Sequence, residues 1–220
     1  MTAVQSAAPR RQLATRSAAW PKALARQLAG AGVTPNAVSV LGAAVAALAA
    51  AVFVLAPRLQ PTGQVAALVV AAAGIQLRLL CNLLDGMLAV EEGLKTTTGD
   101  IYNDLPDRVA DVVILVGAGY SIRHLAVGPA LGWIAALLAV LTAYVRVLGG
   151  SLGLTQHFAG PMAKQHRMFT LTLTTLLAAI EVFLGRPPRA MAAGLLTIAA
   201  GSLVTIVRRT SRILDEARRR

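Results

Sequence analysis

The sequence contains little cysteine and little charge, and each shortage excludes a class of protein. Cys81 is the only cysteine among 220 residues, so the chain has neither an internal disulfide framework nor a cysteine-rich metal site. Charged residues make up 14% of the chain and apolar residues 56%. Soluble domains contain about 25% charged and about 45–50% apolar residues. The composition therefore excludes a disordered chain and argues against an ordinary soluble enzyme.

The apolar residues are gathered into six runs rather than scattered. The runs cover residues 37–57, 65–86, 109–122, 125–148, 168–185 and 190–207. Most of them approach the roughly 20 residues that a helix needs to cross the hydrocarbon core of a bilayer. The third run is shorter, but it reaches that length if the polar residues before it belong to the same helix. We therefore expect an all-α integral membrane protein with six transmembrane helices, in preference to a large soluble helical bundle.

The runs and their flanks predict three regions along the chain. Residues 1–16 are expected to form a disordered tail, residues 17–208 a six-helix membrane domain, and residues 209–220 a basic cytoplasmic tail. Within 17–30, Trp20 and several leucines alternate with Lys22 and Arg26. This pattern predicts a short helix that lies in the membrane interface ahead of the first span.

Acidic residues are scarce, and the positions of the basic residues decide what the imbalance means. The chain has 21 Lys and Arg against 10 Asp and Glu, a formal net charge of +11. On a soluble domain this balance would indicate a nucleic-acid-binding surface. Here sixteen basic residues flank the runs on the side of both termini and four flank them on the other side. Because positive charge favours the cytoplasmic side, we expect cytoplasmic termini, contact with anionic membrane lipid and no nucleic-acid partner.

Most of the acidic residues lie in one segment, residues 81–111, at the junction of the second and third runs. They are Asp85, Glu91, Glu92, Asp100, Asp104, Asp107 and Asp111. Carboxylates at the edge of the hydrocarbon are costly and commonly mark a function. On a helix, Asn82 shares a face with Asp85; on the next helix, Asn103 shares a face with Asp107 and then with Asp111.

Two such faces opposite each other would present oxygen ligands to a hard divalent cation. Gly86 and Gly99 would leave room there for a ligand close to the backbone. A solvated acidic loop, with Pro106 starting the next helix, explains the same spacing. The spacing alone leaves both interpretations open.

The same segment resembles the motif of the CDP-alcohol phosphotransferases, which stands at the second and third of six membrane helices. That motif is D-x-x-D-G-x-x-A-R, then about eight residues, then G-x-x-x-D-x-x-x-D. This chain has N-L-L-D-G-M-L-A-V, eight residues, and G-D-I-Y-N-D-L-P-D. The matching positions are Asp85, Gly86, Ala89, Gly99 and Asp107. The segments 34–36 and 160–167 also resemble the family's T-P-N before the first helix and G-x-x-x-R-x-x-R before the fifth.

The chain departs from this motif at three positions. Asn82 and Asn103 stand where the family has its first and third aspartates, and Val90 replaces its arginine. An asparagine still offers a carbonyl oxygen to Mg²⁺ or Ca²⁺, but it contributes no negative charge. In a second register, Asp107 and Asp111 take the third and fourth aspartate positions. That register needs a spacer four residues longer and loses Gly99.

The resemblance implies a transferase of phospholipid synthesis. It would move a phosphatidyl group from a CDP-alcohol such as CDP-diacylglycerol (CDP-DAG) to an acceptor alcohol, release CMP and use one or two Mg²⁺ or Mn²⁺ ions. In the family, the aspartates hold two cations on the pyrophosphate of the substrate, and the fourth aspartate is the proposed base. By this resemblance Asp107 is the expected base, and the expected metal ligands are Asp85, Asn82, Asn103, Asp107 and Asp111. The residues expected to bind substrate are Gly86, Ala89, Gly99, Lys164, Arg167 and Arg146.

The distribution of basic residues predicts that the active site also faces the cytoplasm, with the protein in the bacterial inner membrane. The resemblance implies a homodimer. Two other functions fit the sequence as well. Because of Asn82, Asn103 and Val90, the chain is also interpretable as a degenerate relative that binds lipid or nucleotide without turnover. A small transporter that uses Asp85 and Asp107 as an ion site is the third hypothesis, and only the intramembrane charge supports it.

Overall fold

The computed structural model describes residues 18–94, 96–158 and 160–219, and every regular element in them is helical. The disordered tail expected at 1–16 lies outside the described residues. The helices are α2 (Ala19–Gly30), α3 (Pro35–Leu55), the short 3-10 helix η1 (Ala56–Arg58), α4 (Pro61–Val90), α5 (Gly99–Ser121), α6 (Gly128–Ser151), α7 (Lys164–Phe183) and α8 (Arg189–Arg218). The expected all-α fold is confirmed.

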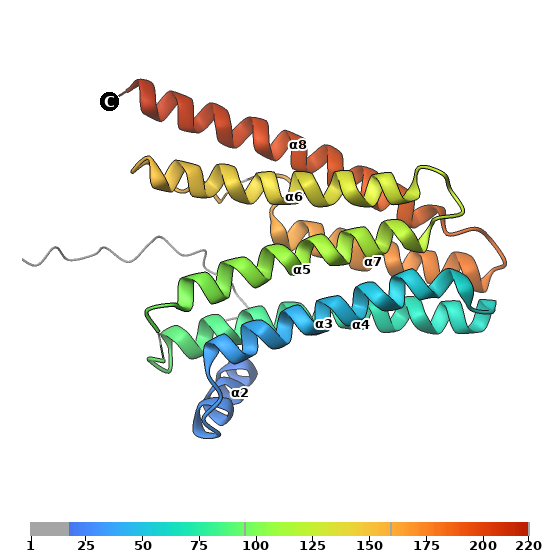
Figure 1. Cartoon of the computed structure of the whole chain (residues 1–220), viewed down its shortest axis with the longest axis horizontal. Helices are drawn as coiled ribbons and strands as arrows, with labels where there is room; N and C mark the ends of the chain where they lie inside the picture. The colour runs from blue at the N-terminus through green and yellow to red at the C-terminus, as the bar shows by residue number, and fades with distance from the viewer. Residues whose placement is uncertain (1–17, 95, 159, 220) are drawn as a thin grey trace, which may run out of the picture.

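Helices α3 to α8 run in alternating directions along an elongated bundle, and α7 starts short of the end at which α6 stops (Figure 1). Helix α3 packs against α4 and α5, α5 against α6, α6 against α8, and α4 against α7. Because six helices traverse the bundle, the start of α3 and the end of α8 lie at the same end, where α2 is also found (Figure 1).

Four helical segments are long and apolar enough to cross a membrane: α3 with η1, α4, α6 and α8. The chain is therefore an integral membrane protein. Helices α5 and α7 have 23 and 20 residues, but they carry more polar side chains. The third apolar run does lengthen as expected, because α5 begins at Gly99 and includes the polar residues before 109.

Small residues let the helices of the bundle approach closely. A Cβ atom added to Gly117 of α5 would lie 2.8 Å from the Cα atom of Ala50 on α3. One added to Gly119 would lie 2.7 Å from the Cα atom of Gly132 on α6. Packing of backbones through small residues is characteristic of helices in lipid, where the hydrophobic effect does not drive helices together. These contacts hold α5 between α3 and α6.

Helix α8 does not end at the domain boundary expected after residue 208. It continues to Arg218, through most of the region expected to be a tail. Arg209 is buried and donates hydrogen bonds to the carbonyl oxygens of Thr142 and Phe158, at 2.6 and 2.9 Å. These bonds tie the end of α8 to α6 and to the connection before α7, so the first residue of the expected tail belongs to the folded domain. Arg220 lies outside the described residues.

Helix α2 occupies most of the segment 17–30, where a short helix was expected. Its buried Ala25 packs with Val38 of α3 and with the last turns of α4, including Leu84 and Leu88. Trp20 is exposed. The helix is confirmed, and its position in the membrane interface stays a prediction.

Candidate active site

A cavity of about 800 Å³ lies at the end of the bundle where α3 begins and α4 ends. The last turns of α4 and the first turns of α5 line it, together with residues of α3, α6, α7 and α8. Ten of the expected site residues line this cavity: Asn82, Asp85, Gly86, Ala89, Gly99, Asn103, Asp107, Arg146, Lys164 and Arg167. Most of the acidic segment is thus helical, and only residues 91–98 connect the two helices. The interpretation as a solvated acidic loop is wrong for Asp85, Asp104, Asp107 and Asp111.

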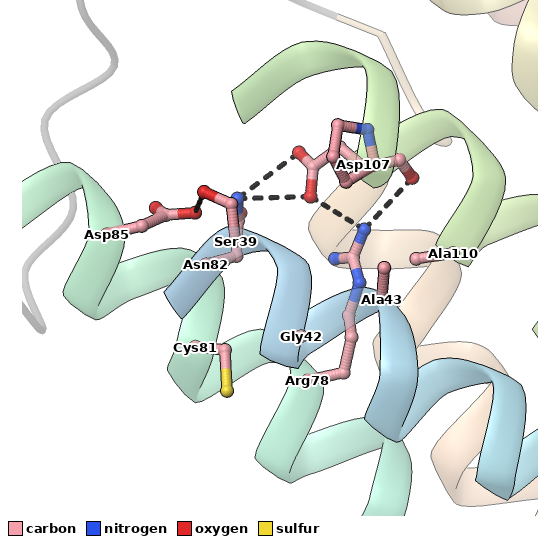
Figure 2. Close-up of a pocket in the computed structure, with 10 residues that line it drawn as sticks. Ser39, Gly42, Ala43, Arg78, Cys81, Asn82, Asp85, Asp107 and Ala110 are labelled. Atoms are coloured by element: carbon pink, nitrogen blue, oxygen red, sulfur yellow. Dashed lines mark hydrogen bonds and ion pairs between the residues drawn. The ribbon is translucent and has the colours of Figure 1, made fainter. Parts of the chain in front are cut away.

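Asp85 is a buried carboxylate, and one of its two oxygens has no hydrogen-bond partner among the described residues. Its side chain belongs to α4, and the residue is 5% exposed. Ser39 of α3 donates a hydrogen bond from Oγ to Asp85 Oδ2 at 2.7 Å (Figure 2). The other oxygen, Oδ1, is buried and has no hydrogen-bond partner among the described residues. A buried carboxylate oxygen without a donor or a cation is costly, so Asp85 Oδ1 is suited to bind one.

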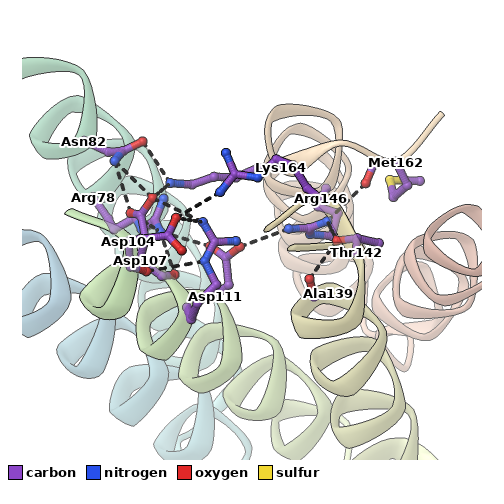
Figure 3. Close-up of polar contacts among 12 residues, drawn as sticks. Arg78, Asn82, Asp104, Asp107, Asp111, Ala139, Thr142, Arg146, Met162 and Lys164 are labelled. Atoms are coloured by element: carbon purple, nitrogen blue, oxygen red, sulfur yellow. Dashed lines mark hydrogen bonds and ion pairs between the residues drawn. The ribbon is translucent and has the colours of Figure 1, made fainter. Parts of the chain in front are cut away.

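Asp107, in contrast, is surrounded by donors from two other helices. Arg78 of α4 donates from Nη2 to Asp107 Oδ1 at 2.9 Å and to the Asp107 carbonyl oxygen at 3.1 Å. Asn82, one turn further along α4, donates from Nδ2 to both carboxylate oxygens, at 3.1 and 3.2 Å. Lys164, the first residue of α7, forms an ion pair with Asp107 Oδ2. Its Nζ also donates to Asn82 Oδ1 at 2.8 Å (Figure 3).

Asp111 lies one turn deeper on α5 and does not line the cavity. Its Oδ1 accepts from Arg78 Nη2 at 3.0 Å, and its Oδ2 accepts from Arg167 Nη2 at 3.0 Å. Arg167 also donates from Nη1 to Thr142 Oγ1 and to the Met162 carbonyl oxygen. Both oxygens of Asp111 are therefore engaged in a buried ion-pair network that joins α4, α5 and α7. This geometry gives no support to Asp111 as a metal ligand or to the second register.

Further basic groups line the cavity beyond Asp107. Arg146 of α6 donates from Nη2 to Asp104 Oδ1 at 3.0 Å, and its guanidinium group lies 5.3 Å from the centre of the Phe158 ring. Arg108 pairs with the same Asp104 oxygen at 3.4 Å. Asn103 is exposed and lines the cavity beside these groups. This arrangement places guanidinium and ammonium donors where a phosphate group can be bound.

The sequence did not reveal the roles of Arg78 and Ser39. Arg78 interrupts the apolar run 65–86, and a charge inside such a run has to find a partner within the bundle. That signal predicts a buried ion pair, but it does not name Asp107 or Asp111. Ser39 carries no signal, because it reaches Asp85 only through the packing of α3 on α4.

Solved structures of another protein share this architecture. No protein-family model and no curated protein matches the chain. Solved structures of the phosphatidylinositol phosphate synthase of Mycobacterium tuberculosis do match it. The complex with CDP-DAG has a TM-score of 0.73 at 23% sequence identity, covering 89% of this chain and 94% of that one. The complex with manganese and citrate has a TM-score of 0.72 at 23% identity, covering 88% of each chain. The apo form has a TM-score of 0.71 at 21% identity, covering 87% and 95%. This chain therefore has the fold of a phosphatidylinositol phosphate synthase.

Proposed function

We propose that this protein is a membrane transferase that moves a phosphatidyl group from a CDP-alcohol such as CDP-DAG to an acceptor alcohol and releases CMP. The observation that carries the proposal is the cavity, which gathers ten of the expected site residues from four helices. The fold supports it, since the phosphatidylinositol phosphate synthase that shares the fold binds CDP-DAG. The volume of about 800 Å³ is also typical of sites for small ligands, which range over about 300–1,000 Å³.

The chemistry needs an attacking oxygen, a proton acceptor and a way to stabilise charge on the pyrophosphate. The acceptor hydroxyl attacks the phosphorus next to the lipid moiety, and the bond from that phosphorus to the oxygen of CMP breaks. Asp107 takes the proton from the hydroxyl, and Arg78 and Asn82 orient its carboxylate. Lys164, Arg167 and Arg146 supply positive charge for phosphate oxygens or a lipid headgroup.

The residues present also fit a hard divalent cation, Mg²⁺ or Mn²⁺. Asp85 offers a buried oxygen without a hydrogen-bond partner among the described residues, and Asn82 and Asn103, whose side chains carry amide oxygens, line the same cavity. Oxygen donors of these two kinds suit such ions. Such a cation would neutralise charge on the pyrophosphate. The neighbouring synthase was solved in complex with manganese.

The topology follows from the arrangement of the helices. We infer that α3 to α8 all span the membrane, that α2 lies in its interface, and that the end with the cavity faces the cytoplasm of a bacterium at the inner membrane. Helix α2, which carries Lys22 and Arg26, and the last turns of α8, which carry most of its basic residues, lie at that end. The helix η1, which ends at Arg58, and the start of α8, at Arg189, lie at the other end. Positive charge favours the cytoplasmic side. The homodimer that the resemblance implies stays a prediction.

One assay tests the reaction. Purified protein is incubated with CDP-DAG, Mg²⁺ or Mn²⁺ and a panel of acceptor alcohols, and CMP and the lipid products are identified. Release of CMP together with a new phosphatidyl lipid is the expected result. A chain that binds CDP-DAG but releases no CMP with any acceptor contradicts the transferase proposal.

A second candidate is a relative that binds the lipid nucleotide without turning it over. The contacts of Asp107 favour it, because Arg78, Asn82 and Lys164 already engage both carboxylate oxygens. The same assay separates the two functions: binding of CDP-DAG without release of CMP identifies the second.

A further inference from the structure

A protein cation already occupies the point where the polar faces of α4 and α5 meet. The Lys164 ammonium group donates a hydrogen bond to Asn82 Oδ1 at 2.8 Å and forms an ion pair with Asp107 Oδ2 (Figure 3). Lys164 is the first residue of α7, so a third helix delivers this positive charge between the other two. The oxygens that converge here are those of one amide and one carboxylate.

The charge around Asp107 is already compensated. Arg78 Nη2 pairs with Asp107 Oδ1 at 2.9 Å, and Arg108 Nη2 lies 3.7 Å from Asp107 Oδ2. A divalent cation bound to Asp107 would lie within a few ångströms of the positive groups of Arg78, Arg108 and Lys164. Like charges at such distances repel strongly in a partly buried site. Asp107 therefore has little capacity left for an added dication.

Asp85 presents the opposite environment. The side chain that donates to it is the neutral Ser39 hydroxyl, Asp85 forms no ion pair among the described residues, and its Oδ1 atom is buried without a hydrogen-bond partner there. The side chain lines the same cavity as Lys164. Asp85 can therefore accept one dication without displacing any protein cation.

The sequence is consistent with this division. Asn82 and Asn103 stand where the resembled motif has two of its four aspartates, so the site has two negative charges fewer. The number of charged ligands helps to set the affinity of a site for divalent ions. Two carboxylates, one of them paired with Lys164, match one dication rather than two.

From this geometry we propose that the site binds a single divalent cation, at Asp85, and that the Lys164 ammonium group takes the place of a second one between Asn82 and Asp107. This inference rests on the proposed function. It assigns Lys164 a role as a resident cation that faces the pyrophosphate of the substrate together with the metal ion.

The first test counts bound Mn²⁺ at equilibrium, by electron paramagnetic resonance of the purified full-length protein in detergent without substrate. The expected count is one ion per wild-type chain, lost in Asp85→Asn. A wild-type count of two, or of zero, overturns the proposal. A count of one that persists in Asp85→Asn also overturns it, because the ion would then lie elsewhere.

The second test creates a binding site for a second ion. Asn82→Asp with Asn103→Asp restores the two carboxylates, and adding Lys164→Met removes the resident ammonium group. The triple variant should bind a second Mn²⁺ roughly tenfold or more tightly than the double variant, because repulsion by Lys164 is gone. Lys22→Met in the double variant is the matched control, since Lys22 lies on α2 outside the cavity lining and should leave the second affinity unchanged.

Thermal unfolding and circular dichroism verify that each variant is folded. If Lys164→Met does not fold, Lys164→Gln removes the same charge, keeps a donor for Asp107 and carries the same expectation. Equal affinity for the second ion with and without Lys164 overturns the proposal.

The number of bound Mn²⁺ ions tests the single-ion inference, and release of CMP tests the transferase proposal, so either proposal can be contradicted without the other. A chain that binds one Mn²⁺ but never releases CMP contradicts the transferase and leaves the single-ion inference standing. A chain that releases CMP while holding two ions contradicts the inference alone.

Discussion

Asp85 and Asp111 are two buried carboxylates within one small region, and their surroundings are opposite. Asp85 is 5% exposed and accepts a hydrogen bond from the neutral Ser39 hydroxyl, and its Oδ1 atom has no hydrogen-bond partner among the described residues. Asp111 is 1% exposed, and arginines from two helices bind both of its oxygens. Burial alone therefore does not distinguish a functional carboxylate from a structural one. The partners distinguish them, because a buried charge that the protein leaves unpaired requires a ligand.

Replacement of Asp85 should affect activity more than any other single change. Asp85→Ala should abolish metal-dependent release of CMP, since Asp104 and Asp107 of the same cavity lining are already paired with basic side chains. Its melting temperature should stay at or above that of the wild type without metal, because the change removes a buried charge that has no ion-pair partner among the described residues. Activity assays and thermal unfolding in detergent measure the two effects.

The control for Asp85→Ala is Asp100→Ala, which removes an exposed carboxylate from the lining of the same cavity. We expect this variant to retain activity. Near-normal turnover in Asp85→Ala would show that the metal site lies elsewhere.

Removal of Asp111 should have the complementary effect on stability. Asp111→Ala leaves Arg78 and Arg167 buried without their shared carboxylate, and breaking a buried ion pair in this way costs about 3–5 kcal/mol. We expect a large fall in melting temperature, measured by thermal unfolding without metal. An Asp111→Ala variant as stable as Asp85→Ala would remove the distinction between the two carboxylates.

A third prediction concerns the amides between these carboxylates. Asn82→Asp together with Asn103→Asp adds two negative charges to the cavity with little change in side-chain size. The affinity for Mn²⁺ should rise by roughly tenfold, because ligand charge helps to set the affinity for divalent ions. Titration with Mn²⁺ measures it, and Glu91→Gln, which changes a charge in the connection 91–98, serves as a control. Unchanged metal dependence of the double variant would mean that neither amide faces the cation.

The smallest expected effect is that of Ser39. Ser39→Ala removes the hydroxyl that donates to Asp85 Oδ2 and should lower the free energy of unfolding by about 1–3 kcal/mol. The count of bound Mn²⁺ should not change, since Oδ1 carries the ion. Ser202→Ala is a matched control, because the Ser202 hydroxyl is buried without a partner among the described residues and its removal should cost nothing. Loss of the ion in Ser39→Ala would place the ion on the oxygen that Ser39 holds.

Much of the fold could be predicted from local patterns. Apolar runs of helical length require helices in lipid, since a helix satisfies its backbone polar groups internally. The extent of α5 was less evident, because its first three turns carry Asp100, Asn103, Asp104 and Asp107. These polar residues are helical since they face the cavity rather than lipid. The extension of α8 through Arg209 likewise depended on the carbonyl oxygens of α6 and of the following connection.

The amino-acid sequence alone establishes an all-α membrane protein in which one short segment holds most of the carboxylates, because hydrophobicity and spacing along a helix are local properties. Which of these carboxylates remains without an ion-pair partner depends on how the helices pack. Arg78, Lys164 and Arg167 lie up to 89 residues apart in the chain, and their charges select partners among three aspartates only when α4, α5 and α7 pack together. Electrostatic pairing depends on distances in space, so Asp107 and Asp111 form ion pairs with these cations. Asp85 forms no ion pair among the described residues, and its Oδ1 atom keeps no hydrogen-bond partner there.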